Sequence, residues 1–226
     1  MMDILKQDWR TLRIAAFDSE TTGLDPKTHR LVEFSIIVFE DGQPIEKFQR
    51  LINPQREIDP KAEAVHHISS EMLADKKPFK ARAARIKEIL DDCDVWCAFN
   101  ETFDRNFLHH EFSRTELKLV DKPTLDPRIL ADHYWPTGPN TLDAVSQRLR
   151  LQPKQSTLDE LGIDKNRHRA DFDALLAGMA LFAFAARLPK RLDHSLIVQD
   201  WMYRSWLVFT KGGQSKFVRE LEPTLP

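Results

Sequence analysis

Apolar segments near the amino end of the chain predict three strands joined by short connections. The first two strands are expected at 12–19 and 31–39. The Asp41-Gly42 pair is expected to turn the chain into a third strand that ends near Ile52. An Asp-Gly pair between apolar runs is a common hairpin turn. The segment therefore predicts an antiparallel start to a sheet.

After Pro54 the spacing of apolar residues changes from that of strands to that of helices. Helical spacing is found at 79–90, from 103 onward and at 170–187, with a short apolar strand expected at 95–99. Asn140 is the expected N-cap of a further helix, and the polar segment 152–169 is expected to be a loop. Strands and helices in this order predict an α/β fold with a mixed sheet.

Composition and charge narrow the class of protein without indicating a ligand. Of 226 residues, 42% are hydrophobic, which is enough for a substantial core. The 33 Lys and Arg against 35 Asp and Glu leave a net charge of −2, so no global basic field indicates nucleic acid. Cys93 and Cys97 are expected to be reduced, partly buried thiols near a helix-to-strand junction. With no leader or membrane-spanning run recognised, a soluble, cytoplasmic protein is expected.

Four acidic residues and one histidine are candidates for a metal site. Asp18 and Glu20 close the first predicted strand and point to one face, because strand side chains alternate. Asp104 follows the short strand at 95–99, where loops at strand ends build sites. Asp173 lies inside the long predicted helix, and His168 is expected on the loop before it.

Taken singly, each of these residues has an ordinary structural explanation. Acidic residues at strand ends are commonly solvated, Asp104 suits a helix N-cap, and Asp173 could face water as its neighbour Asp171 is expected to do. The combination is harder to explain in this way, because four carboxylates raise one another's pKa when no cation is present. Their four negative charges balance those of two divalent cations, which favours a metal site.

Three ordered motifs carry the resemblance to a known family. They are FDSETTGL at 17–24, NETFD at 100–104 and HRADFD at 168–173, accompanied by VHHI at 65–68 and NTLD at 140–143. Over 14–187 the chain resembles the DnaQ-like exonucleases of the DEDDh type, a superfamily that includes the proofreading ε subunit of bacterial replicative polymerase and exonuclease X. The resemblance implies a ribonuclease H-like mixed sheet flanked by helices. It also implies an exonuclease domain at 10–189, followed by a C-terminal extension at 190–226.

The resemblance further implies which residues hold the metals and which one moves a proton. Asp18, Glu20, Asp104 and Asp173 are expected to ligate two Mg²⁺ or Mn²⁺ ions, with Asp18 bridging them. In this chemistry the cations stabilise the attacking and leaving oxygens of an in-line displacement at phosphorus. His168 is the candidate general base, because an imidazole titrates near neutral pH. The expected products are nucleoside 5'-monophosphates released from a 3' end.

Substrate contacts are expected from a second set of residues in the same motifs. By resemblance, backbone near the first motif holds the terminal nucleotide, a leucine wedges beside its base, and other residues contact sugar or phosphate. These candidates are Thr21, Thr22, Leu24, His66, Asn100 and Phe103. Leu24 and Phe103 could instead be core residues. Phe99 and His67 depart from the usual family pattern, which bears on substrate preference.

The polymer and the partners are left open by the sequence. Single-stranded DNA 3' ends in proofreading or repair are favoured, an RNA exonuclease is the alternative, and a noncatalytic interaction module is a weaker one. The extension at 190–226 contains Trp201, Trp206 and Phe209, so it is expected to pack on the domain or to bind a polymerase or other protein partner.

Overall fold

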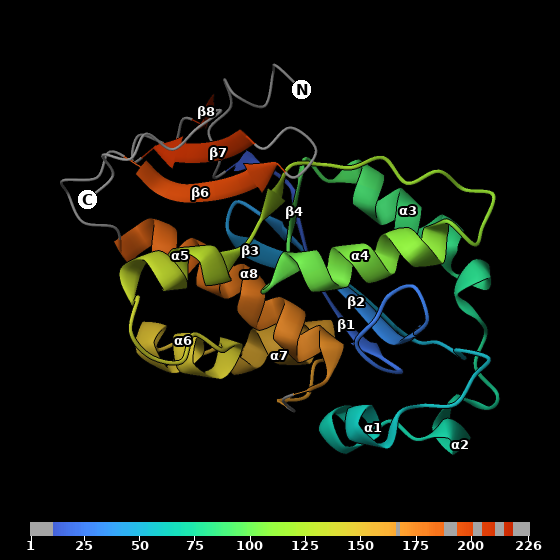
Figure 1. Cartoon of the computed structure of the whole chain (residues 1–226). Coiled ribbons are helices and arrows are strands. Elements are labelled where there is room, and N and C mark those ends of the chain that lie inside the picture. The colour runs from blue at the N-terminus through green and yellow to red at the C-terminus, as the bar shows by residue number, and fades with distance from the viewer. Residues whose placement is uncertain (1–10, 166–167, 188–193, 201–204, 211–214, 219–226) are drawn as a thin grey trace.

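One mixed sheet forms the centre of the molecule. The computed structural model describes residues 11–165, 168–187, 194–200, 205–210 and 215–218. In these residues eight strands lie in the order β3-β2-β1-β4-β5-β6-β7-β8 (Figure 1). Their bounds are β1 (Ile14–Thr21), β2 (Leu31–Glu40), β3 (Gln43–Leu51), β4 (Val95–Cys97), β5 (Thr124–Leu125), β6 (His194–Asp200), β7 (Ser205–Thr210) and β8 (Ser215–Val218).

The predicted antiparallel start of the sheet is confirmed. β2 pairs with β1 and with β3 in antiparallel register, and the hairpin between β2 and β3 turns at Asp41 and Gly42, both with positive φ. β4 pairs in parallel with β1 and with β5, so the sheet is mixed, as predicted. Parallel neighbours need crossover connections, and helices supply them here.

Helices cover both faces of the sheet. Their bounds are α1 (Pro60–His66), α2 (Ser70–Leu73), the 3-10 helix η3 (Phe79–Ala81), α3 (Ala83–Asp92), α4 (Glu101–Phe112), α5 (Pro127–Tyr134), α6 (Leu142–Leu149), α7 (Gln155–Leu161) and α8 (Ala170–Arg187). α8 packs with α6 and α7 against one face, and α3 and α4 pack against the other (Figure 1).

The two faces of β1 and β2 explain why these strands are apolar along nearly their whole length. Ile14 and Ala16 of β1 join the core under α8, whereas Ala15 and Phe17 join the core under α3 and α4. A strand buried on both faces needs apolar residues at successive positions rather than alternating ones. Gly178 lets α8 lie close to β2, because a Cβ there would meet the ring of Phe39 at 2.2 Å.

Two predictions about local structure are wrong. The N-cap of α6 is Thr141, whose hydroxyl accepts the N–H of Ala144, whereas Asn140 is a half-buried linker that donates to Asp132 and accepts from Arg148. The segment 152–169 is not loop throughout, because α7 forms within it. Leu158 of α7 is buried in the core under α8. Tertiary packing therefore stabilises a helix that could not be predicted from this polar segment.

The described parts of the extension continue the sheet. β6 pairs antiparallel with β5 at Thr124↔Gln199 and Leu125↔Val198, and β7 and β8 follow as antiparallel neighbours. Trp201 lies outside the described residues, and Trp206 and Phe209 lie in β7, where only the backbone is described.

Cys93 and Cys97 are free and buried, at the end of α3 and in β4. In the described residues, none of the helices is both long and apolar enough to span a membrane.

Candidate active site

The carboxyl end of β1 is where acidic side chains gather. Asp18 and Glu20 continue the row of Ile14 and Ala16, so they emerge on the face that α8 covers. Both are half-buried, and the hydrophobic row ends where this polar pair begins. The strand therefore carries two carboxylates out of the core toward the start of α8.

The first turn of α8 brings two more groups to this point. Asp173 is buried in that turn, and His168 is exposed on the loop just before the helix, with φ of 60°. Glu20, His168 and Asp173 each offer a ligand atom, and these atoms lie within 4.8 Å of one another. Asp171 is buried rather than solvated, and its carboxylate is paired with Lys47 Nζ at 3.2 Å. Of the two aspartates in this turn, Asp173 is therefore the one directed into the cluster.

Asp104 reaches the same end of β1 from the opposite face. It lies in the first turn of α4, is 3% exposed, and accepts a hydrogen bond of 2.5 Å from Ser19 Oγ. Ser19 points away from Asp18 and Glu20, toward the α4 side. Pairing of β4 with β1 stops at Ala16↔Cys97, so α4 lies beside the following residues of β1. Asp104 and Asp18 are not in the 4.8 Å group, although both lie at this strand end.

Burial controls the charge of Asp104. Desolvation raises the pKa of this carboxyl from 3.8 to about 7, although hydrogen bonds from Ser19 act in the opposite direction. A buried carboxyl with this pKa is largely protonated below neutral pH unless a positive charge lies near it. A divalent cation would supply that charge. Carboxylate oxygens and an imidazole are donors that Mg²⁺ and Mn²⁺ accept, so the residues present fit such an ion.

A pocket opens beside the acidic end of β1. Its volume is about 370 Å³, which falls in the range of small-molecule sites and suits a single nucleotide. It lies between the end of β1, the loop after it and α1. Its lining is Ser19, Glu20, Thr21, Gly23, Leu24, Asp59, Lys61, Ala62, Val65, His66 and Phe103.

The pocket contains four of the six residues predicted to contact substrate. Leu24 is 82% exposed, which excludes the core alternative for this residue. Phe103 is half-buried, and its ring packs at 5.0 Å from the ring of Phe107 with one side left on the pocket. His66 Nδ1 accepts the N–H of Ile68, so Nε2 carries the proton and donates to Thr21 O at 3.2 Å. Both ring nitrogens are thus occupied, and burial lowers the pKa of His66.

Thr22 and Asn100 do not line this pocket. The Thr22 hydroxyl contacts His29 Nδ1 and accepts the N–H of Arg30, while its backbone bonds to Arg30 and Asp59. Asn100 is exposed at the N-cap of α4, where its Oδ1 accepts from Arg128. Thr22 therefore shapes the loop behind the pocket, and Asn100 lies outside the pocket.

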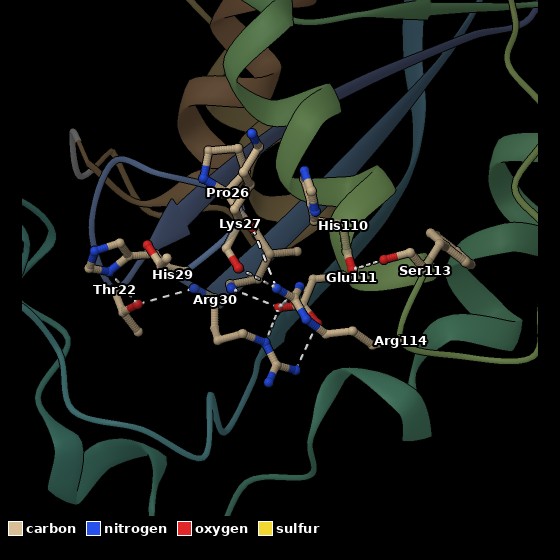
Figure 2. A network of polar contacts seen from close by, with 12 residues as sticks. Thr22, Pro26, Lys27, His29, Arg30, His110, Glu111, Ser113 and Arg114 are labelled. Atoms are coloured by element: carbon tan, nitrogen blue, oxygen red, sulfur yellow. Dashed lines mark hydrogen bonds and ion pairs between the residues drawn. The ribbon is translucent and has the colours of Figure 1, made fainter.

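The loop that carries Leu24 is held at its far end by α4. Glu111, 1% exposed, accepts from Arg30 Nε at 2.6 Å and Nη2 at 2.8 Å (Figure 2). Arg114 contacts Glu111 and donates to the carbonyl oxygen of Lys27 at 3.2 Å. Bidentate Arg–carboxylate pairs fix geometry as well as charge. The loop is therefore anchored beside the pocket by an ion pair whose carboxylate is buried.

Several residues of the site were not predicted. Ser19 holds Asp104, and a second ion pair with a buried carboxylate, Glu33 with Arg169, lies at the start of α8. Glu33 had a usable signal, because it is a single charge inside the apolar run 31–39. Ser19 had no such signal, because a serine between two acidic residues does not by itself indicate a hydrogen bond to a distant carboxylate.

Comparisons with known proteins agree on one family. The exonuclease family model RNase_T matches residues 15–181. The DNA polymerase III subunit epsilon of Rickettsia prowazekii is 36% identical over 147 residues, which are 62% of this chain and 64% of that protein. The 3'-5' exonuclease DinG of Bacillus subtilis is 30% identical over 178 residues, 78% of this chain but 18% of that protein. The chain thus spans less than two thirds of either relative.

A solved structure has the same fold. Exonuclease X, solved in complex with 5' overhanging duplex DNA, superposes with a TM-score of 0.58 at 24% identity. The match covers 75% of this chain and 88% of that one. At this identity the likeness concerns the fold, and it agrees with a helix-flanked mixed sheet.

Proposed function

Because the chain belongs to the exonuclease family, whose model spans residues 15–181, we propose that it is a metal-dependent 3'→5' exonuclease. One observation carries the proposal: Glu20, His168 and Asp173 meet within 4.8 Å beside a pocket of nucleotide size. A structural role alone would not require acidic groups to converge at the mouth of a cavity. The product is expected to be a nucleoside 5'-monophosphate.

The roles proposed for the acidic residues come from the family resemblance, and the position of these residues at the end of β1 supports them. Asp18, Glu20, Asp104 and Asp173 would hold two divalent cations, which when bound activate water and stabilise the leaving oxygen. Asp104 would reach the end of β1 from the α4 side, and Asp173 would reach it from the α8 side. His168, exposed at the edge of the cluster, would accept the proton of the attacking water.

The pocket supports a single-stranded 3' end as the substrate. Its volume admits one nucleotide, and a paired base would have to leave its partner to enter. Exposed Leu24 and the face of Phe103 offer apolar surface to the base, a mode of contact that does not depend on sequence. DNA is favoured over RNA because the relative with 36% identity is a DNA polymerase subunit. We place the activity in proofreading or repair on the same ground.

The test is digestion of three 5'-labelled substrates by the purified chain with Mg²⁺ or Mn²⁺. Single-stranded DNA, duplex DNA with a mismatched 3' end, and RNA of matching sequence are compared in parallel. Single-stranded DNA is expected to give a ladder shortened from the 3' end, and both EDTA and Asp18→Ala are expected to abolish it. Intact DNA across a full titration of both metals would refute the proposal. A preference for RNA by orders of magnitude would move the assignment to an RNA exonuclease.

We also propose that the described strands of the extension, β6 to β8, belong to the folded domain. The pairing of β6 with β5, and the contacts of β6 with α8 and α5, support packing on the domain over a free tether to a polymerase. A chain that ends at residue 189 is expected to lose at least about 4 °C in Tm, because it exposes the edge of β5. An unchanged Tm, together with loss of a co-purifying polymerase, would favour the partner alternative.

A further inference from the structure

Glu33 is a buried charge in the middle of an apolar strand. It lies in β2 and is 0% exposed, between Val32 and Phe34, which are also fully buried. Its carboxylate accepts from Arg169 Nη2 at 2.6 Å, Arg169 Nε at 3.1 Å, Ala170 N at 3.1 Å and Gln49 Nε2 at 2.9 Å. A buried carboxylate is tolerated only when it is paired and hydrogen-bonded in this way.

These bonds join β2 to the first residues of α8. Arg169 contributes a two-pronged side-chain contact, and Ala170 contributes a backbone N–H that no earlier turn of the helix can satisfy. Glu33 therefore acts as a helix cap from a distant strand. Two hydrogen bonds to one guanidinium fix both the orientation of the Arg169 side chain and its distance from Glu33.

His168 is the residue immediately before this anchor. Its side chain is exposed, and its backbone has φ of 60°, a left-handed conformation that non-glycine residues rarely adopt. Such a conformation persists where surrounding contacts hold it. In the described residues that follow His168, the hydrogen bonds of Arg169 and Ala170 with Glu33 are contacts of this kind. The imidazole that lies within 4.8 Å of Glu20 and Asp173 is thus carried by backbone directly adjacent to this anchor.

We propose that Glu33 is a positioning residue for His168, acting through Arg169 and the amino end of α8. The inference rests on the proposed function, in which His168 takes the proton of the attacking water. Glu33 itself touches no substrate. A small displacement of a general base lowers the rate of the chemical step and leaves binding of the nucleotide largely unchanged.

The chain offers a matched control in Glu111. This second buried carboxylate also holds an arginine by two bonds, to Arg30, but it anchors the loop that carries Leu24 (Figure 2). Both glutamates are almost completely buried from solvent. Glu111→Gln should therefore affect KM for the nucleic acid, whereas Glu33→Gln should affect kcat.

The experiment is a double-mutant cycle between Glu33→Gln and His168→Ala on the full chain. Glu33→Gln is expected to lower kcat by about 10–100-fold in the wild-type background and by less than about twofold in His168→Ala. Glu111→Gln is expected to have equal effects in both backgrounds. Arg169→Lys serves as a second variant, since it keeps the charge, loses the two-pronged contact and lies at a partly exposed side chain.

A readout without metal or activity accompanies the cycle. The imidazole signal of His168, identified by its absence in His168→Ala, is followed by NMR in EDTA. Glu33→Gln and Arg169→Lys are expected to shift or broaden this signal, and Glu111→Gln is expected to leave it in place. An equal loss of kcat from Glu33→Gln in both backgrounds, or an unmoved His168 signal, would overturn the proposal. If His168→Ala keeps wild-type kcat, the assignment of the base itself fails, which is a separate result.

Discussion

Asp104→Asn is expected to abolish nuclease activity while making the metal-free protein more stable above neutral pH. Asp104 is proposed to ligate a cation, and loss of such a ligand removes several kcal/mol of transition-state stabilisation, which corresponds to at least about 10³-fold in kcat. Asn keeps the shape of the side chain, and its carbonyl oxygen can still accept the Ser19 hydroxyl. The loss of activity is therefore attributed to the missing charge rather than to a disturbed fold.

The gain in stability follows from the raised pKa of Asp104. The pKa of this carboxyl is about 7 in the folded protein against 3.8 ordinarily, so between these values the folded state binds a proton that the unfolded state does not. The contribution of this proton to stability is fully present below pH 3.8 and is lost as pH rises through about 7. Asn stays neutral, so the stability of the variant relative to the wild type should be about 1–3 kcal/mol greater at pH 8 than at pH 5.

Urea unfolding in EDTA at the two pH values measures this difference. Asp171→Asn is the matched control, since its buried carboxylate is paired with Lys47 and its neutralisation should destabilise the protein. A difference in unfolding free energy between Asp104→Asn and wild type that is the same at pH 5 and pH 8 would contradict the burial argument. Retained activity in Asp104→Asn would remove Asp104 from the metal site.

His168→Ala is expected to lower kcat by about 10²–10⁴-fold, the range for loss of a general base. The structure also raises a competing role, because His168 lies within 4.8 Å of Glu20 and Asp173 and could ligate a cation. The two roles differ in metal affinity. Removal of a general base should leave the affinity for Mn²⁺ unchanged. Removal of a metal ligand, or of a group hydrogen-bonded to a ligand, lowers the affinity for the metal by about 10–100-fold.

Calorimetry with Mn²⁺ and rescue by added imidazole separate these roles. The exposed position of His168 leaves room for free imidazole, so partial recovery of kcat is expected if the residue is a base. His110→Ala, at a half-buried histidine of α4 outside the acidic cluster, is the control and should keep wild-type kcat. Weakened Mn²⁺ binding without rescue would make His168 a ligand instead.

The family and the general architecture were predictable because they depend on local patterns. Apolar runs placed β1 to β3, and helical spacing placed α8 at 170–187, which agrees with Ala170–Arg187 in the structure. The three motifs predicted the exonuclease family, and the family match over 15–181 confirms it. Errors arose where packing overrides local preference, as in α7, which is stabilised by contacts made far along the chain.

By itself, the sequence determined which chemistry is available: carboxylates at 18, 20, 104 and 173 and an imidazole at 168. Only the tertiary structure decided which of these groups meet, and Glu20, His168 and Asp173 do so within 4.8 Å. It brought Asp104 and Asp173 to the end of β1 from helices on opposite faces of the sheet, occupied both nitrogens of His66 and exposed Leu24. It also paired Glu33 with Arg169, residues 136 positions apart. Local preference acts over a few residues, whereas a buried ion pair forms only where the folded chain brings its partners together.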